Sequence, residues 1–168
     1  LNLLNIESII NKKNIGYEKS LIKAFHYIIK KYPNTKNIIT FDADGEHKTS
    51  DLDKIITFCK IRKPGLLICN RQNIKRFSEK LINFFFKLKF NIDDPLSGLK
   101  VYNLKILKKY INKIKPDYFL TNLAKKICIH KHKVLNFPIK CNMIKNRQPR
   151  IGNYFFSNIK ILKILLII

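Results

Sequence analysis

Apolar residues recur along the chain with two different spacings, and these spacings predict where helices and strands form. In residues 16–32 the apolar positions return every three to four residues, which is the spacing of an amphipathic helix. The positions on this face are Leu21, Ala24, Phe25, Ile28 and Ile29. Pro33 ends the pattern because proline cannot continue a helix.

Short continuous apolar runs separate the helical segments and predict buried strands. The predicted strands cover residues 37–41, 65–70, 99–103 and 133–139, and residues 5–10 form either a further strand or a helix. The predicted helices cover residues 50–59 with Ser50 as N-cap, 74–90, 104–114 and 118–130. Alternating strands and helices indicate one α/β domain whose mostly parallel sheet is flanked by helices. Ligands bind such sheets at the carboxyl ends of the strands.

The charge of the chain narrows the class of partner. Its 168 residues include 34 Lys+Arg against 11 Asp+Glu, a formal net charge of +23. This excess indicates an anionic partner, namely nucleic acid, a phosphorylated substrate or an anionic membrane surface. The alternative is that the charge has no specific function, since it is mostly Lys in a chain rich in Ile and Asn. Because the longest strictly basic runs are pairs, a dedicated nucleic-acid reader is disfavoured.

The cysteines and histidines give little sign of a metal site. The four cysteines show no CxxC spacing, which is typical of buried or inert thiols in a reducing compartment. His130 and His132 alternate and could reach a metal from a strand, but no cysteine or acid lies near them in the sequence.

The seven aspartates are clustered, and the clusters point to a site. Four of them lie in "FDADGEH" and "DDPLSG", as Asp42, Asp44, Asp93 and Asp94. Two carboxylates one residue apart at the end of a strand can share Mg²⁺ or Mn²⁺, which leaves positions open for phosphate oxygens. The alternative for Asp42 and Asp44 is a plain acidic turn.

Two further segments place candidate side chains at strand ends. Arg71 follows the strand at 65–70, where a guanidinium can meet phosphate; the alternative is a surface arginine. The "DDPLSG" turn precedes the strand at 99–103 and would aim Asp94 into the same cleft. The alternative for this segment is a simple connector between a helix and a strand.

Five segments in order resemble landmarks of a known enzyme family. They are "NKKNIGYEKSLIKAF", "IITFDADGEHKTSDLDKII", "LLICNR", "DDPLSGLKVY" and "VLNFPIKCNMIKNRQPRIGNYFFSNIKIL". The chain resembles a family-2 glycosyltransferase with the GT-A (Rossmann-like) fold, nearest to the dolichol- and polyprenyl-phosphate mannose or glucose synthases. It departs from the family's pattern at Glu46, where Gln is usual, and at Thr49, where Pro is usual.

The resemblance implies a role for each candidate residue. Asp42 would lie near a nucleotide-sugar donor, and Asp44, together with Asp42, would bind Mg²⁺ or Mn²⁺ on its diphosphate. Arg71 would contact a phosphate of the donor or of a lipid acceptor. Asp94 would orient the attacking oxygen of the acceptor or act as base in an inverting hexose transfer.

The C-terminal part of the chain would complete the site. Arg147 and Arg150 would lie on a loop that closes over the diphosphate, with an ordinary basic surface loop as the alternative. Residues 1–154 would form the glycosyltransferase-like domain, and residues 155–168 would begin a membrane-interfacial helix, with a core helix as the alternative. The implied partners are a nucleotide-sugar donor, a polyprenyl-phosphate or glycan acceptor and a membrane surface, at the cytoplasmic face of the cell membrane and without nucleic acid.

The family's first two strands have no counterpart before Asn14. They normally carry the motifs "PayNEe" and "DDgS", and this chain begins at what would be the third strand. The resemblance therefore predicts an N-terminally incomplete domain, either a fragment or split gene product or an inactive remnant. A basic nucleic-acid-binding protein is the rival from a different class.

Overall fold

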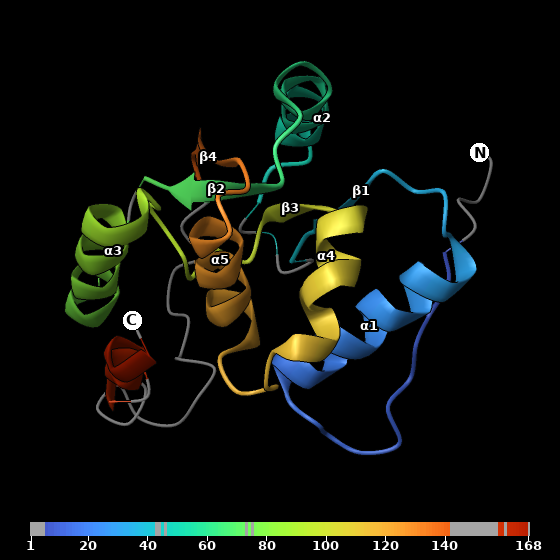
Figure 1. Ribbon diagram of the computed structural model, residues 1–168, viewed down its shortest axis with the longest axis horizontal. Coiled ribbons are helices and arrows are strands. Elements are labelled where there is room, and N and C mark those ends of the chain that lie inside the picture. Colours follow the sequence, from blue (N-terminus) through green and yellow to red (C-terminus); the bar gives the residue numbers. More distant parts are fainter. Residues whose placement is uncertain are drawn as a thin grey trace.

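A mixed sheet lies at the centre of the molecule, with helices on both of its faces (Figure 1). The computed structural model describes residues 6–42, 45, 47–72, 74, 76–141, 158–159 and 161–167. The strands are β1 Asn37–Thr40, β2 Leu66–Arg71, β3 Lys100–Asn103 and β4 Val134–Ile139. The helices are α1 Tyr17–Lys31, α2 Ser50–Arg62, α3 Phe77–Phe90, α4 Leu104–Tyr110, α5 Phe119–Ile129 and the 3₁₀ helices η1 Ile111–Lys113 and η2 Lys163–Ile167.

The direction of β3 contradicts the expected mostly parallel, Rossmann-like sheet. The order of the strands is β1-β3-β2-β4, and β3 pairs antiparallel with both β1 and β2. Among the strands that the structure describes, only β2 and β4 pair in parallel. Alternating helices and strands indicate an α/β fold but do not fix the direction in which each strand enters the sheet. The observed fold is α/β with a mixed, mostly antiparallel sheet, so the GT-A sheet expected from the resemblance is wrong.

The segment between α3 and β3 explains the reversal. After α3, residues 91–99 return the chain to the edge of the sheet at which β2 ends. Asn136 of β4 holds this segment by donating to the carbonyl of Asn91 at 2.8 Å and by accepting from the backbone N–H of Asp93 at 3.1 Å. β3 therefore starts beside the end of β2 and runs in the opposite direction. Since β1, β2 and β4 all share one direction, their carboxyl ends still lie at one edge.

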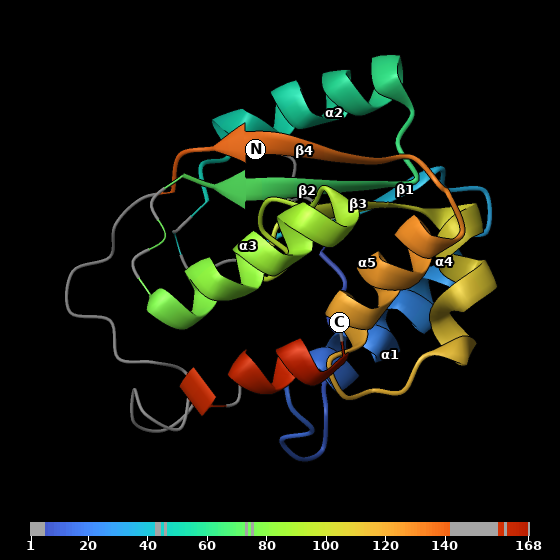
Figure 2. The ribbon, with the colours of Figure 1, turned by 60° about the vertical axis from the view of Figure 1, so that its left-hand side comes forward.

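Side chains alternate between two cores across the sheet. Leu66 and Ile68 of β2 pack into the core under α1, α3, α4 and α5, whereas Leu67 and Cys69 pack into the core under α2. This period of two is the geometry of a strand buried on both faces. Figure 2 shows α2 on one side of the sheet and the other helices on the opposite side.

Most of the expected elements form within about three residues of their predicted bounds. The predicted apolar face of α1 is confirmed for Leu21, Phe25, Ile28 and Ile29, which contact the larger core. The strand or helix expected at residues 5–10 does not form in residues 6–10. In α2 the N-cap position is held by Thr49, not Ser50, and no side chain caps it.

Candidate functional site

Three of the predicted site residues lie at the carboxyl edge of the sheet. Asp42 follows β1, Arg71 is the last residue of β2, and Asp94 lies in the segment that leads into β3. Asp44, Arg147 and Arg150 lie outside the described residues. The shared direction of β1 and β2 brings the first two to the same edge, and the reversal of β3 brings the third.

Arg71 and Asp94 form a two-point ion pair. Nε of Arg71 donates to Oδ2 of Asp94 at 2.8 Å, and Nη2 donates to Oδ1 at 3.0 Å. The backbone N–H of Arg71 also donates to Oδ2 at 3.1 Å. The Asp94 side chain is 1% exposed, so its partners must replace the water that it loses on folding. This arrangement fixes the plane and direction of the guanidinium at the strand end.

A second carboxylate holds the same guanidinium. Nη2 of Arg71 donates to Oε2 of Glu79 on α3 at 3.0 Å. Burial lowers the pKa of Arg71, but the hydrogen bond and charge of Asp94, with the charge of Glu79, outweigh burial and raise this pKa above its usual value. Arg71 is therefore always charged. Nη1 makes no hydrogen bond to the described residues, which leaves this nitrogen for a ligand anion.

The Ser97–Gly98 turn joins the ends of β1 and β2. Oγ of the fully buried Ser97 donates to the carbonyl of Cys69 at 2.6 Å, and Oγ1 of Thr40 donates to the carbonyl of Gly98 at 2.7 Å. A Cβ built on Gly98 would overlap with Oδ2 of Asp42 and lie 3.0 Å from its Cγ. A side chain at position 98 would therefore fill the space that the Asp42 carboxylate occupies.

Lys100 lies beneath this turn and is wholly buried. Its Nζ donates to the carbonyl of Pro95 at 2.9 Å and to the carbonyl of Ser97. Burial lowers the pKa of Lys100 to about 8, against the opposing charge of Asp94. The ammonium thus stabilises the carbonyls of the turn from below and adds a second positive charge near Asp94.

A divalent cation fits the chemistry of Asp42. Mg²⁺ is usually bound by one or two carboxylates and takes its other ligands from phosphate oxygens and water. Asp42 with Asp44 would supply such a pair. Among the described residues, no three His, Cys, Asp or Glu side chains gather closely enough to hold a metal by themselves. A cation at this edge could also take ligand oxygens from a bound diphosphate.

Three of the four histidines have structural partners. His47 is 7% exposed; its ring lies 5.5 Å from that of Phe41, and its Nδ1 lies 3.9 Å from Sγ of Cys141, so it supports the turn. His130 follows α5 and hydrogen-bonds through Nδ1 to the carbonyl of Lys126 at 2.9 Å. His132 contacts the hydroxyl of Tyr110 through Nε2 at 3.0 Å. The two histidines are therefore not displayed side by side on a strand.

Two site residues were missed by the sequence reasoning. Lys100 could have been predicted from the sequence, because it is a single charged residue inside the apolar run Leu99–Tyr102, and a charged residue in a buried strand needs polar partners. Glu79 gave no comparable signal, since an acid in the first turn of a helix is common. Its role depends on where α3 lies against β2.

Comparison with known proteins leaves the family open. No protein-family model matches the chain. The chain is similar to MJ1222, an uncharacterized protein of Methanocaldococcus jannaschii, with 29% identity over 119 residues. The match covers 62% of this chain and 49% of that protein, so this chain spans about half the length of its relative.

Proposed function

We propose that the chain belongs to a glycosyltransferase that moves a hexose from a nucleotide-sugar donor to a polyprenyl-phosphate or glycan acceptor, with inversion and with Mg²⁺ or Mn²⁺. One observation carries the proposal: Asp42, Arg71 and Asp94 surround a single glycine turn at the carboxyl edge of the sheet. The ordered motifs that resemble family-2 glycosyltransferases supply the reaction class. The activity is proposed for the whole protein, of which this chain can be one part.

The acidic pair after β1 would hold the donor. Asp42 and Asp44 would bind the cation, which when bound neutralises charge on the diphosphate, including the charge that develops as it leaves. Gly98 supports this role, because a side chain at position 98 would fill the space that the Asp42 carboxylate occupies at the strand edge.

Arg71 would bind a phosphate of the donor or of the acceptor. Its guanidinium is held by Asp94 and Glu79, and 23% of the side chain is exposed. A cation whose direction is fixed before the ligand arrives loses less side-chain entropy on binding. Arg147 and Arg150 would add charge from the loop that closes over the diphosphate.

Asp94 would act on the acceptor side. With both oxygens facing Arg71, its first effect is to hold that guanidinium in place. For a hydroxyl acceptor, Asp94 would also orient the attacking oxygen or take its proton. A phosphate acceptor is already ionised and needs no base.

Transfer of labelled hexose tests the proposal. The whole protein that contains this chain is incubated with Mn²⁺, a set of UDP- and GDP-linked hexoses and polyprenyl phosphate in detergent. We expect label in the lipid fraction, lost with a chelator and in Asp42→Asn, and kept in Asp117→Asn, which changes an acid that is not one of the candidate site residues. Absence of label with every donor and lipid, or label that survives Asp42→Asn, contradicts the proposal.

A further inference from the structure

The solvent side of α3 is apolar. Phe77 is 77% exposed, Phe84 57%, Phe85 41% and Leu88 70%, whereas Ile82 and Phe86 on the opposite side are fully buried. Since 3.6 residues make a turn, the four exposed side chains lie along one stripe of the helix. We call Phe77, Phe84, Phe85 and Leu88 the α3 stripe. A helix that is apolar on both sides is typical of one with a partner on each side.

Lysines flank the α3 stripe. On the helical wheel Lys80 and Lys87 lie along one flank and Lys89 lies along the other. Lys87 also pairs with Asp93 at 2.6 Å. The side chains of the stripe are therefore bordered by ammonium groups on both flanks.

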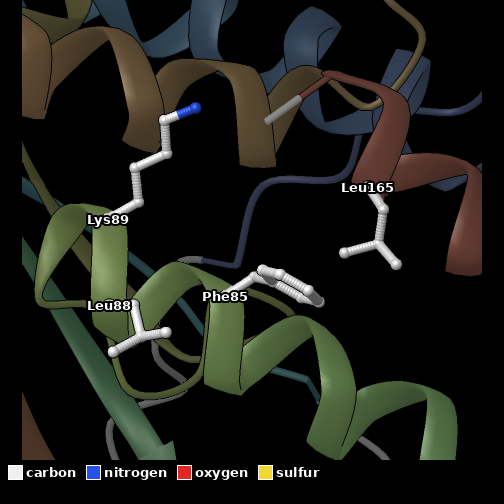
Figure 3. Close-up of a pocket in the computed structure, with 4 residues that line it drawn as sticks. All are labelled: Phe85, Leu88, Lys89 and Leu165. Atoms are coloured by element: carbon white, nitrogen blue, oxygen red, sulfur yellow. The ribbon is translucent and has the colours of Figure 1, made fainter.

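The α3 stripe continues into a groove. Phe85, Leu88 and Lys89 of α3 and Leu165 of η2 line a groove of about 430 Å³. Figure 3 shows Phe85 and Leu88 projecting from α3 and Leu165 from η2. The apolar surface is thus wider than one helix. No helix in the described part of the chain is long and apolar enough to cross a membrane.

We propose that the α3 stripe docks on the surface of a bilayer that contains anionic phospholipid. Phenylalanine and leucine bordered by lysine are the residues by which helices lie in the lipid interface, with the rings among the acyl chains and the ammonium groups at the phosphates. The formal net charge of +23 favours the same partner. A second copy fits less well, because a two-fold contact between stripes brings the flanking lysines of both copies together.

The α3 stripe begins beside the candidate site. Glu79, two residues after Phe77 in the first turn of α3 and on the opposite side of the helix, is the residue that holds Arg71 at 3.0 Å. Docking would therefore place the bilayer beside the end of α3 that holds Arg71. This link deepens the proposed function and rests on it, whereas docking itself depends only on α3 and can be tested without a nucleotide.

Tryptophan fluorescence tests the docking, because the chain has no tryptophan of its own. Leu88→Trp places one reporter on the stripe, and Ile61→Trp places a matched control on α2, where Ile61 is 72% exposed. Each full-length variant is mixed with vesicles of phosphatidylcholine alone or of phosphatidylcholine and phosphatidylserine in equal parts. We expect a blue shift for Leu88→Trp with the anionic vesicles and none for Ile61→Trp.

Vesicle sedimentation then tests each part of the surface. Phe84→Asp with Leu88→Asp should abolish binding to anionic vesicles, and Lys80→Gln and Lys89→Gln should each weaken it about fivefold. Lys60→Gln on α2 is the matched control and should bind as the parent does. Circular dichroism of each variant would check that it is folded.

Three results overturn the docking proposal. They are no binding of the folded parent to anionic vesicles, equal binding by Phe84→Asp with Leu88→Asp, and a dimer in solution that the same substitutions dissociate. The last result assigns the stripe to a second copy. None of them affects nucleotide binding, so failure of docking and failure of the proposed function are distinguishable.

Discussion

The carboxylate of Asp94 accepts two hydrogen bonds from the guanidinium of Arg71, at 2.8 and 3.0 Å, across 23 positions of the chain. The pair joins the end of β2 to the segment that turns into β3. Together with the contacts of Asn136, it therefore holds the segment that reverses the sheet, and it fixes the direction of the Arg71 guanidinium at the candidate site. The same ion pair thus stabilises the fold and positions a side chain of the candidate site.

Asp94→Asn tests this pair. It leaves a buried guanidinium with one charged partner fewer, and breaking a buried ion pair typically costs about 3–5 kcal/mol. We expect the free energy of unfolding, measured with urea, to fall by about 3 kcal/mol. Asp93→Asn is the neighbouring control; it breaks only the more exposed pair with Lys87 and should cost under about 1 kcal/mol. Equal costs for the two variants would contradict the account.

Gly98→Ala tests the contact with Asp42. The new methyl group would overlap with the Asp42 carboxylate, so we expect a loss of about 1–2 kcal/mol in the parent. In an Asp42→Ala background the overlap is gone, and the same substitution should cost under about 0.5 kcal/mol. Urea unfolding of the parent, the two single variants and the double variant measures the coupling energy between the two positions. Additive costs would mean that the two residues do not touch.

The buried Lys100 predicts a pH dependence of stability. Its pKa is lowered from 10.5 to about 8, so between these values the unfolded chain binds more protons than the folded chain. The free energy of unfolding therefore rises with pH between these two values. Below them Lys100 is charged in both states, and the full free-energy cost of burying this charge lowers stability. Compared with Lys100→Met, the parent should gain on the order of 3 kcal/mol between about pH 8 and 10.5.

Urea unfolding at several pH values checks this difference. Burial also raises the pKa of Cys69 to about 12, but this thiol is present in both chains and largely cancels in the comparison. Parallel stability curves for the parent and Lys100→Met would show that Lys100 is not buried in charged form.

Local patterns predicted the elements but not the direction of β3. The period of apolar residues located α1, and short apolar runs located the four strands, because burial on the sheet depends on neighbours in the sequence. The direction of β3 depends on the segment at 91–99 and on its contacts with Asn136 and Arg71, which lie far away in the chain. No local pattern carries that information.

The candidate site was predicted in part for a similar reason. Asp42 and Asp94 were visible because acids are few in this chain, and Arg71 because it ends a strand. Glu79 joins them only through the packing of α3. The α3 stripe was not predicted either: a helix was expected over residues 74–90, but within the run Phe84–Phe86 only Phe86 is buried and the other two are exposed.

Titration calorimetry with nucleoside diphosphates tests the central claim most directly. We predict that the full chain binds GDP or UDP with Mn²⁺, that a chelator abolishes binding, and that Asp42→Asn weakens it at least about tenfold, worth about 1.4 kcal/mol. Asp51→Asn, which changes an acid in the first turn of α2, should bind as the parent does. Absence of binding to both nucleotides, or binding that neither the chelator nor Asp42→Asn changes, would contradict a metal-dependent nucleotide site at this edge of the sheet.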